Sequence, residues 1–331
     1  ITPWNFPSSM ITRKAAPALG AGCTVIIKPS EATPLSAIAL AHLAEKAGIP
    51  KGVFNIVTGD AKTIGKVLTD DPRVKKFSFT GSTKVGKTLM AQCADTVKKV
   101  SLELGGNAPF IIFEDADIEK AAEGAVTSKF RNAGQTCICA NRIFVHADIY
   151  DQFLEKMVEK TKALNVGNGM DEKTDIGPMI NMDGLEKAEE LLKDALDGGA
   201  KLHCGGDRLN DIGKQYFQPT VITDVTPQMR IFKEEIFGPV AAIYKFDDTD
   251  EVIEKANDTQ YGLAAYIYTN DLKRSWQVPE RLEYGMVGVN SSLLSLPQAP
   301  FGGVKESGFG REGGKHGIED YIHTKYLSIQ F

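Results

Sequence analysis

The stretch Lys76-Phe-Ser-Phe-Thr-Gly-Ser-Thr-Lys-Val-Gly-Lys-Thr88 decides the fold class. Its first five residues, Lys76–Thr80, have the composition of a strand, and the turn residues Gly81 and Ser82 follow them. A helix is then expected from Thr83 to about Ala94. The stretch is therefore a strand, a turn and a helix in succession, which is the building block of an α/β protein.

The same unit recurs on both sides of this stretch. Strands that alternate with helices at this spacing require right-handed crossovers and a parallel sheet, whose ligands bind at the carboxyl ends of the strands. We therefore predict a Rossmann-like, doubly wound parallel sheet in the first part of the chain. The further strands are expected at Thr24–Lys28, Val53–Thr58 and Lys98–Glu103, with one helix from Pro34 to Gly48, capped by Thr33, and a short one after Asp60.

The motif Leu104-Gly105-Gly106 interrupts this alternation, and a second α/β series begins with a strand at Pro109–Phe113. We place an NAD-binding domain over residues 1–105, a catalytic domain over 106–304 and a C-terminal segment over 305–331. This segment ends in the alternating apolar tail Tyr326–Phe331, which we expect to form a strand that pairs with another subunit. Further helices are expected from near Asp117, at Asp148–Leu164, Asp183–Asp197 and Glu251–Asn257.

The composition bears on partners and on location. The 331 residues carry a formal net charge of −5 with scattered charges, so we expect no nucleic-acid partner, and no apolar run reaches membrane-spanning length. Five thinly spread cysteines indicate a reducing compartment, and we expect a cytoplasmic protein. The start at Ile1, without an initiator methionine, reads as the end of a strand entering a turn at Ile1–Pro7, and we expect an N-terminally truncated chain.

Two of the cysteines lie in Phe130-Arg-Asn-Ala-Gly-Gln-Thr-Cys-Ile-Cys-Ala-Asn-Arg142. Small and polar residues surround them, with an arginine on either side, which suits a reactive thiolate better than a core thiol. Cys137 is therefore the first candidate nucleophile. The alternative is a small residue that fills a turn, and a Cys-x-Cys metal site lacks a second pair of ligands.

The segment Gly81–Thr88 also satisfies the Walker A pattern, follows a strand and opens a helix. A P-loop nucleotidase is therefore a rival hypothesis, in which Lys87 would reach the terminal phosphate. It would leave Cys137 without a function. With either hypothesis, the helix start at Gly81 and Ser82 is a candidate seat for phosphate, and we favour the pyrophosphate of a dinucleotide.

Seven motifs, in the same order and from the first residues to the last, resemble the aldehyde dehydrogenase superfamily. The cysteine stretch and the run Phe301-Gly-Gly-Val-Lys-Glu-Ser-Gly-Phe-Gly-Arg-Glu-Gly313 are most similar to succinate-semialdehyde dehydrogenases. The motifs are Pro3-Trp-Asn-Phe-Pro7, Lys28-Pro-Ser-Glu31, Phe79-Thr-Gly-Ser82, Glu103-Leu-Gly-Gly106, Gly134-Gln-Thr-Cys137, Glu234-Glu-Ile-Phe-Gly-Pro239 and Pro300-Phe-Gly-Gly303.

The resemblance implies catalytic roles for residues whose chemistry fits them. Cys137 would attack the aldehyde, and the Asn5 amide with the Cys137 backbone N–H would stabilise the oxyanion. Glu103, followed by two glycines that let it move, would activate the hydrolytic water. Lys14 and Glu312 match a structural and proton-relay pair. Without the resemblance, the alternatives are a solvated strand-end carboxylate for Glu103, a turn residue for Asn5, and a surface pair for Lys14 and Glu312.

The resemblance also implies a cofactor site for NAD, with NADP less favoured because the Glu31 carboxylate would repel a 2′-phosphate. The alternative for Glu31 is a charge in the first turn before the helix that Pro34 opens. Lys28 would hold the adenosine ribose together with Glu31, and Glu235 with Phe237 would hold the nicotinamide riboside. The other cofactor-binding candidates are Thr2, Pro3, Trp4, Ser30, Gly81, Ser82 and Gly105.

An aldehyde with a distal carboxylate needs a cation, and arginine can hold it with two parallel hydrogen bonds. Arg13, Arg131 and Ser295 match substrate positions of semialdehyde enzymes, although either arginine alone is equally a structural ion pair. Succinate semialdehyde is the expected substrate, with glutarate semialdehyde, an aminoaldehyde or an inactive remnant as alternatives. Cys139 is a candidate redox partner of Cys137, and the full-length protein is expected to form a homodimer or homotetramer.

Overall fold

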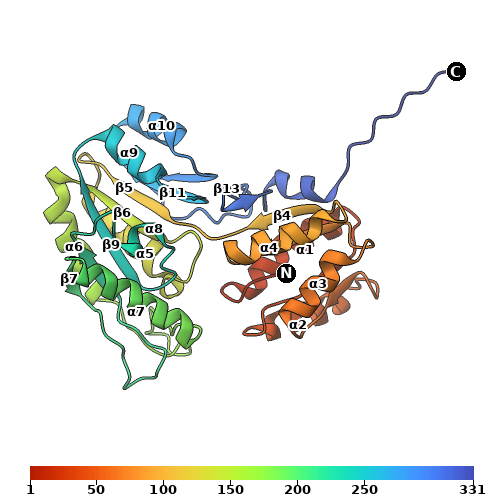
Figure 1. The fold of residues 1–331 in the computed structure, drawn as a ribbon, viewed down its shortest axis with the longest axis horizontal. Helices are drawn as coiled ribbons and strands as arrows, with labels where there is room; N and C mark the ends of the chain where they lie inside the picture. Colours follow the sequence, from red (N-terminus) through yellow and green to blue (C-terminus); the bar gives the residue numbers. More distant parts are fainter. The chain divides into compact units, whose positions relative to one another are not determined.

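The computed structural model describes residues 1–331 and divides the chain into two compact units. The first unit contains residues Ile1–Leu104, Ser295–Gly302 and Gly308–Phe331, and the second contains Gly105–Leu294 and Gly303–Ser307. The chain therefore passes between the units at the Leu104-Gly105 and Leu294-Ser295 steps, and twice more in the glycine-rich run near its end. Each unit is described by itself (Figure 1).

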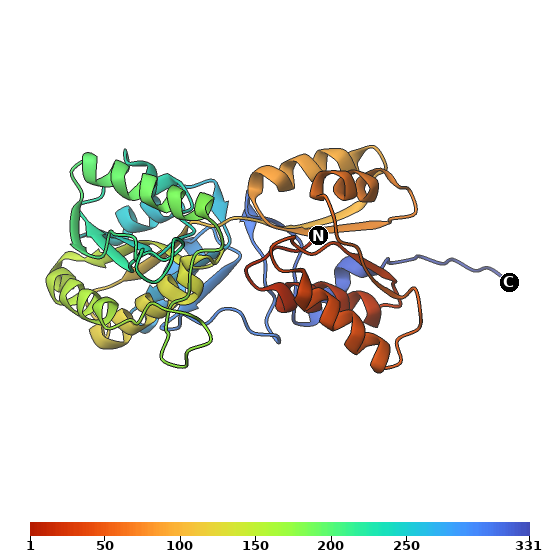
Figure 2. The ribbon, with the colours of Figure 1, turned by 90° about the horizontal axis from the view of Figure 1, so that it is seen from below.

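Most strands and helices of the first unit follow the predicted alternation. Strand β3 and helix α4 begin and end at the predicted residues, and the side chains of Asp60 and Ser82 cap α3 and α4. Figure 2 shows α4 lying along β3 and β4. The elements are α1 (Pro7–Gly20), β1 (Val25–Ile27), α2 (Pro34–Lys46), β2 (Phe54–Ile56), α3 (Ala61–Asp70), β3 (Lys76–Thr80), α4 (Thr83–Ala94), β4 (Lys99–Glu103), β14 (Gly308–Phe309) and the 3-10 segment η3 (Lys315–Tyr321).

Helix α1 is absent from the sequence prediction, which expected a strand end and a turn around Ile1–Pro7. The helix begins with a proline at its first position, where the missing N–H costs nothing. Two features concealed it: Phe6 precedes it without a side-chain cap, and Pro17 lies inside it. The error matters because α1 carries Arg13 and Lys14.

The four predicted strands of this unit do not form one sheet. Strands β1 and β2 pair in parallel, while β3 pairs with β4 in parallel and β14 adds to β4 in antiparallel orientation. The segment Ile1–Thr2 lies between the two sheets: the Ile1 nitrogen donates to the Ser78 carbonyl (2.8 Å), and the Thr2 N–H donates to the Lys28 carbonyl (3.1 Å). A cavity of about 720 Å³ lies beside this segment, and residues of β1 and β3 line it.

The second unit contains a seven-stranded sheet with the order β12-β11-β5-β6-β9-β8-β7, parallel except for β7. Its strands are β5 (Ala108–Ile112), β6 (Ala140–His146), β7 (Lys201–Cys204), β8 (Thr220–Thr223), β9 (Val240–Phe246), β11 (Ala264–Tyr268) and β12 (Met286–Val289). The short strands β10 (Tyr261–Gly262) and β13 (Val304–Lys305) form a separate pair. Every residue of β5, β8 and β11 is buried, so the middle of this sheet is the core of the unit.

Helices cover both faces of this sheet. From β5 the chain moves to β6 and crosses to β7 at the edge of the sheet. It then comes back through β8 to β9 and passes to β11 and β12 on the other side of β5. Right-handed crossovers therefore place α5 on one face and α9 and α10 on the other, and Figure 1 shows α9 and α10 together. Helix α6 packs against α5. The helices are α5 (Ile118–Phe130), α6 (Tyr150–Lys162), α7 (Met182–Asp197), α8 (Arg230–Lys233), α9 (Thr249–Asn257) and α10 (Leu272–Arg281), with 3-10 segments η1 (Arg131–Gly134) and η2 (Ala147–Ile149).

The C-terminal tail differs from its prediction as a strand. Residues 322–331 contain no helix or strand, and Tyr326, Leu327, Ile329 and Phe331 are exposed. Its pairing with another subunit stays a prediction.

None of the helices combines the length and the apolar character that crossing a bilayer requires.

Candidate active site

Cys137 lies in the turn just before the amino end of β6, in the second unit. It is partly exposed, while Thr136, Ile138 and Cys139 on either side are at most 7 % exposed. The Tyr266 hydroxyl donates to the Ile138 carbonyl (2.6 Å) and fixes the backbone directly after the thiol. The Cys137 thiol is therefore accessible, while the backbone on either side of it is held in place, as a nucleophile requires.

Cys139 has the opposite environment. Its side chain is buried, its Sγ donates to the Gly134 carbonyl (3.3 Å), and the buried Lys129 ammonium lies 3.9 Å from the sulfur. Burial raises the pKa of the Cys139 thiol, and the nearby lysine only partly offsets this effect. Cys139 is therefore the less nucleophilic thiol of the two, and its role as a redox partner of Cys137 stays a prediction.

The two glycines after Glu103 have a packing reason. A Cβ added to Gly106 would lie 2.2 Å from the Cys137 carbonyl oxygen, and one added to Gly105 would lie 2.8 Å from Oε2 of Glu235. The sequence prediction explained them by the movement that they give to Glu103. In the second unit they allow the backbone to approach the nucleophile turn and the Glu235 side chain.

Glu235 accepts a hydrogen bond from the Gly106 N–H (3.0 Å). Burial raises the pKa of Glu235 to about 7, although this N–H, Lys187 and Lys129 favour the charged form. Phe237, two residues later, has a positive φ of 52°, which is rare for an aromatic residue and orients the loop. The Gly105, Glu235 and Phe237 candidates thus share one region of the second unit with Cys137.

Two buried asparagines that the sequence analysis missed hold this loop. The Asn141 amide donates to the Glu234 carbonyl (3.0 Å), its oxygen accepts from the Ile236 N–H (3.1 Å), and it also donates to Asn107 (2.6 Å). Asn107 in turn donates to the Phe232 carbonyl (3.0 Å). Buried amides bonded on both sides orient a loop, and their only sequence signal is an asparagine inside an apolar strand pattern.

In the first unit, Lys14 on α1 forms a buried ion pair with Glu312. Glu103, at the end of β4, is 4 % exposed, and neither carboxylate oxygen has a hydrogen-bond partner. Burial raises the pKa of Glu103 well above its usual value, the Glu312 charge raises it further, and Lys14 with nearby arginines opposes both effects. A buried carboxyl with a raised pKa is suited to proton transfer near neutral pH. The environment therefore matches a general base, and it excludes the solvated carboxylate.

Arg13, on the same helix, donates to the Ser295 hydroxyl, and its guanidinium stacks on the Phe301 ring 4.3 Å from the centroid. Its Nη1 is buried and has no hydrogen-bond partner. The first unit thus brings together two of the predicted substrate residues. The third, Arg131, is exposed and opens η1 of the second unit, six residues before Cys137.

The cofactor candidates of the first unit form two groups. Lys28 is 2 % exposed and pairs with the exposed Glu31, while the Ser30 hydroxyl accepts from the Ala32 N–H (3.2 Å). Partial burial acts to raise the pKa of Glu31, but the hydrogen bond and charge of Lys28, together with a backbone hydrogen bond, outweigh it and lower the pKa. An ammonium beside an exposed carboxylate offers a donor and an acceptor for ribose hydroxyls.

The second group lies around the start of α4 and the segment before α1. Ser82 caps α4, and the hydroxyls of Thr2 and Thr80 are buried without a hydrogen-bond partner. Asn5 is partly exposed in the segment that contains Pro3 and Trp4. Orphaned hydroxyls and a helix N-terminus fit a phosphate-bearing group, so the donor set is compatible with a dinucleotide.

The P-loop hypothesis is not supported by this geometry. The Gly81 N–H, which a P-loop would direct at a phosphate, donates to the Glu103 carbonyl (3.1 Å). A Cβ at Gly86 would lie 2.4 Å from Leu104, so this glycine allows α4 to pack closely. The Gly81 N–H and the close packing at Gly86 thus both serve the fold of this unit.

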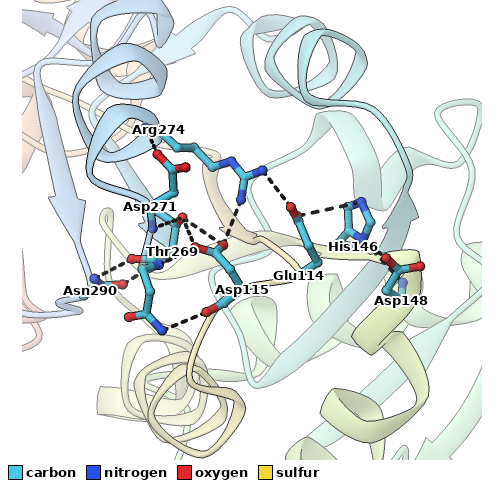
Figure 3. Close-up of polar contacts among 9 residues, drawn as sticks. Glu114, Asp115, His146, Asp148, Thr269, Asp271, Arg274 and Asn290 are labelled. Carbon is cyan, nitrogen blue, oxygen red and sulfur yellow. Dashed lines mark hydrogen bonds and ion pairs between the residues drawn. The ribbon is translucent and has the colours of Figure 1, made fainter.

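The carboxyl edge of the second unit's sheet is occupied by a network of polar side chains (Figure 3). Arg274 donates to Asp115 (2.8 Å) and to Glu114 (2.7 Å), and Asp115 also accepts from the Thr269 hydroxyl (2.9 Å). Asn290 accepts from the Thr269 N–H (3.0 Å). Doubly wound sheets commonly bind ligands at this edge, where the strand order reverses, but here the charges satisfy one another. Cys137 lies at the opposite, amino end of β6.

Comparison with known proteins agrees with these features. Residues 1–327 match the model of the aldehyde dehydrogenase family. The chain is 56 % identical over 329 residues to a succinate-semialdehyde dehydrogenase [NADP(+)] of Escherichia coli and 57 % identical over 329 residues to a 3-sulfolactaldehyde dehydrogenase of Pseudomonas putida, in each case covering 99 % of this chain and 68 % of the relative.

A solved structure gives the same result for the fold. The crystal structure of succinate-semialdehyde dehydrogenase from Burkholderia pseudomallei matches with a TM-score of 0.97 and 55 % identity, over 98 % of this chain and 67 % of that one. The chain therefore spans about two thirds of the length of these proteins. The predicted α/β fold and the enzyme class, an NAD(P)-dependent aldehyde dehydrogenase similar to succinate-semialdehyde dehydrogenases, are confirmed. The chain belongs to the aldehyde dehydrogenase family.

Proposed function

We propose that the protein oxidises an aldehyde that carries an anionic group at its far end, with succinate semialdehyde as the preferred substrate. The observation that carries this proposal is the Arg13 guanidinium, which is oriented by Ser295 and Phe301 and keeps a buried Nη1 without a hydrogen-bond partner. A buried donor without an acceptor is costly, and a carboxylate would satisfy it. Arg131, six residues before Cys137 in the sequence, is the second candidate cation for such a group.

In the proposed reaction, the Cys137 thiolate attacks the aldehyde carbon. The Asn5 amide and the Cys137 backbone N–H then stabilise the oxyanion, and loss of one such donor costs about 3 kcal/mol of barrier. A bound nicotinamide cofactor supplies the acceptor for the hydride, which leaves a thioester on Cys137. Glu103 takes a proton from the water that hydrolyses this thioester, which agrees with its raised pKa.

A second substrate is supported by a specific comparison. The relative from Pseudomonas putida is named for 3-sulfolactaldehyde, whose sulfonate is also an anion, and it is as similar to this chain as the succinate-semialdehyde enzyme. An arginine can donate hydrogen bonds to a carboxylate or to a sulfonate, so the guanidinium alone does not discriminate between the two substrates. We keep succinate semialdehyde first and 3-sulfolactaldehyde second.

For the cofactor we propose NAD over NADP, because the exposed Glu31 carboxylate can accept from both ribose hydroxyls and would repel a 2′-phosphate. The Escherichia coli relative is named for NADP. A comparison of turnover with NAD and with NADP therefore tests the role proposed for Glu31. Equal or faster turnover with NADP would refute it. Glu31→Ser is then expected to move the preference toward NADP, because it removes the repelling charge.

We further propose a cytoplasmic homo-oligomer. None of the five cysteines is in a disulfide, and such cysteines suit a reducing compartment. The exposed alternating tail Tyr326–Phe331 offers an apolar edge for a second copy. Light scattering of the protein with and without these six residues tests the tail, since an unchanged mass would remove it from the interface.

The substrate proposal is tested with Arg131→Ala and Arg13→Ala. Each variant is expected to raise the Michaelis constant for succinate semialdehyde much more than that for an uncharged aldehyde of similar length. Lys120→Ala is the matched control, because Lys120 is an exposed cation on α5 with only a neighbouring aspartate as its partner. An equal rise for both aldehydes in the arginine variants would refute the anionic-substrate assignment.

A further inference from the structure

The turn that precedes Cys137 has an unusual backbone. Asn132, Ala133 and Gly134 are consecutive residues with positive φ angles of 53°, 56° and 74°. The left-handed region is unfavourable for residues with a Cβ, so a run that includes Asn132 and Ala133 persists only when its surroundings hold it. The nucleophile therefore follows a strained left-handed turn by three residues.

Gln135 provides the hydrogen bonds that hold this turn. Its side-chain amide donates to the Asn132 carbonyl (3.0 Å), and its backbone N–H donates to the same oxygen (3.1 Å). Its side-chain oxygen accepts from the Ile180 N–H (2.9 Å), and its amide also lies 3.4 Å from the Pro178 carbonyl. The side chain is 2 % exposed, so these bonds are shielded from water.

Close backbone packing fixes the other side of the turn. A Cβ at Gly134 would lie 2.2 Å from the Gly238 carbonyl oxygen and 3.1 Å from that of Lys129. The Gly134 carbonyl also accepts from the Cys139 thiol. The turn therefore touches the loop that carries Glu235 and Phe237, while Gln135 links it to the segment at Pro178–Ile180.

We infer that Gln135 is a positioning residue that sets the location and reactivity of the Cys137 thiol by clamping the left-handed turn against Ile180. This role deepens the proposed function, since the thiol is the nucleophile of that reaction. Without the clamp, the turn relaxes from its strained conformation, and Cys137 moves with it. The thiol then loses its fixed position just before the amino end of β6, and we expect its reactive thiolate form to be less populated.

The experiment measures Cys137 directly, in the complete chain without aldehyde or cofactor. The rate of alkylation by iodoacetamide is followed across pH by mass spectrometry of the peptide that contains Cys137. Gln135→Met removes every side-chain hydrogen bond, and Gln135→Glu keeps the acceptor for Ile180 but loses the amide donors. Gln215→Met is the matched control, because Gln215 donates to the Ile180 carbonyl (3.3 Å) from elsewhere in the unit.

Both Gln135 variants are expected to alkylate Cys137 several-fold more slowly at neutral pH, with the midpoint of the pH profile moved upward. The Gln215 control is expected to keep the parent profile. Ala133→Gly, which relieves strain at a positive φ, is expected to restore part of the rate when it is combined with Gln135→Met. Turnover of succinate semialdehyde should fall about 100-fold in kcat with little change in KM, as displacement of a reacting group predicts.

A parent-like alkylation profile in a folded Gln135 variant would overturn the inference, and so would an equal slowing in the Gln215 control. If Gln135→Met does not fold, Gln135→Glu is measured by the same criteria. Failure of the proposed function would show as absent turnover in the parent protein, while the alkylation profiles still decide the role of Gln135.

Discussion

The Lys14 ammonium donates a hydrogen bond to the Glu312 carboxylate, 298 residues further along the chain, and both side chains are buried. This ion pair joins helix α1 to the returning C-terminal segment within the first unit. The Glu312 charge also raises the pKa of Glu103, and the Lys14 charge lowers it. The pair therefore contributes both to stability and to the protonation of the proposed base.

Removal of one partner should be costly. Glu312→Gln is expected to destabilise the protein by about 3–5 kcal/mol, because it leaves the Lys14 charge buried without its counter-ion. Chemical denaturation measures this loss. Glu319→Gln, which removes an exposed partner of His316, is the control and should cost less than about 1 kcal/mol. Equal losses in the two variants would show that the buried ion pair contributes no more to the free energy of unfolding than an exposed one.

The raised pKa of Glu235 predicts a pH-dependent stability. A carboxyl whose pKa rises from its usual value to about 7 on folding binds more protons in the folded state between these values, so stability falls as pH rises through this window. Ionisation of the buried Glu235 lowers the free energy of unfolding. This loss is absent below about pH 4.5 and complete above about pH 7, where it is on the order of 3 kcal/mol.

Glu235→Gln removes this titration and keeps an acceptor for the Gly106 N–H. The variant is therefore expected to have a higher Tm than the parent at pH 8 and a similar one at pH 4.5. Calorimetry at both pH values measures the difference. A variant that is less stable than the parent at pH 8 would contradict the assignment of the raised pKa.

The polar network at the carboxyl edge of the sheet in the second unit is expected to stabilise the fold without contributing to catalysis. Arg274→Met should cost about 1–3 kcal/mol per charged hydrogen bond lost, because it leaves Glu114 and Asp115 without their shared cation. Arg281→Met, on the same helix, removes an exposed ion pair with Asp250 and is the control, with an expected loss below about 1 kcal/mol. A Cys137 alkylation rate that falls in the Arg274 variant would show that this edge does affect the nucleophile.

The two cysteines of the nucleophile turn should differ in reactivity. Cys137 is partly exposed, whereas Cys139 is buried with a raised pKa, so iodoacetamide at neutral pH is expected to label Cys137 and to spare Cys139. Peptide mapping measures the two positions separately. Labelling of Cys139 at a comparable rate would mean that the turn opens readily, and it would favour the redox partnership of the two thiols.

The strand and helix pattern was predictable where local chemistry determines it. Strand β3 and helix α4 were located from the strand composition of Lys76–Thr80 and the turn at Gly81. Helix α1 was missed because it has no capping side chain at its start and a proline within it. The division of the strands between two sheets could not be predicted either, because pairing depends on which segment lies between β1 and β3.

The candidate site shows the same limit. Cys137, Glu103 and Arg13 could be named from motifs, since their chemistry is carried by residue type. Residues that act through long-range contacts were missed, because Gln135 meets Ile180 only in the folded chain. The two glycines after Glu103 were found but explained by movement, whereas close packing against Cys137 and Glu235 accounts for them.

The central claim is that Cys137 forms the covalent intermediate and Glu103 drives its hydrolysis. The direct test is mass spectrometry of the Glu103→Gln variant after mixing with succinate semialdehyde and NAD. The account predicts an acyl group on the peptide that contains Cys137, which accumulates in the Glu103→Gln variant and is absent from Cys137→Ala. Cofactor reduction without an acyl group on Cys137, or an adduct that persists in Cys137→Ala, would contradict it.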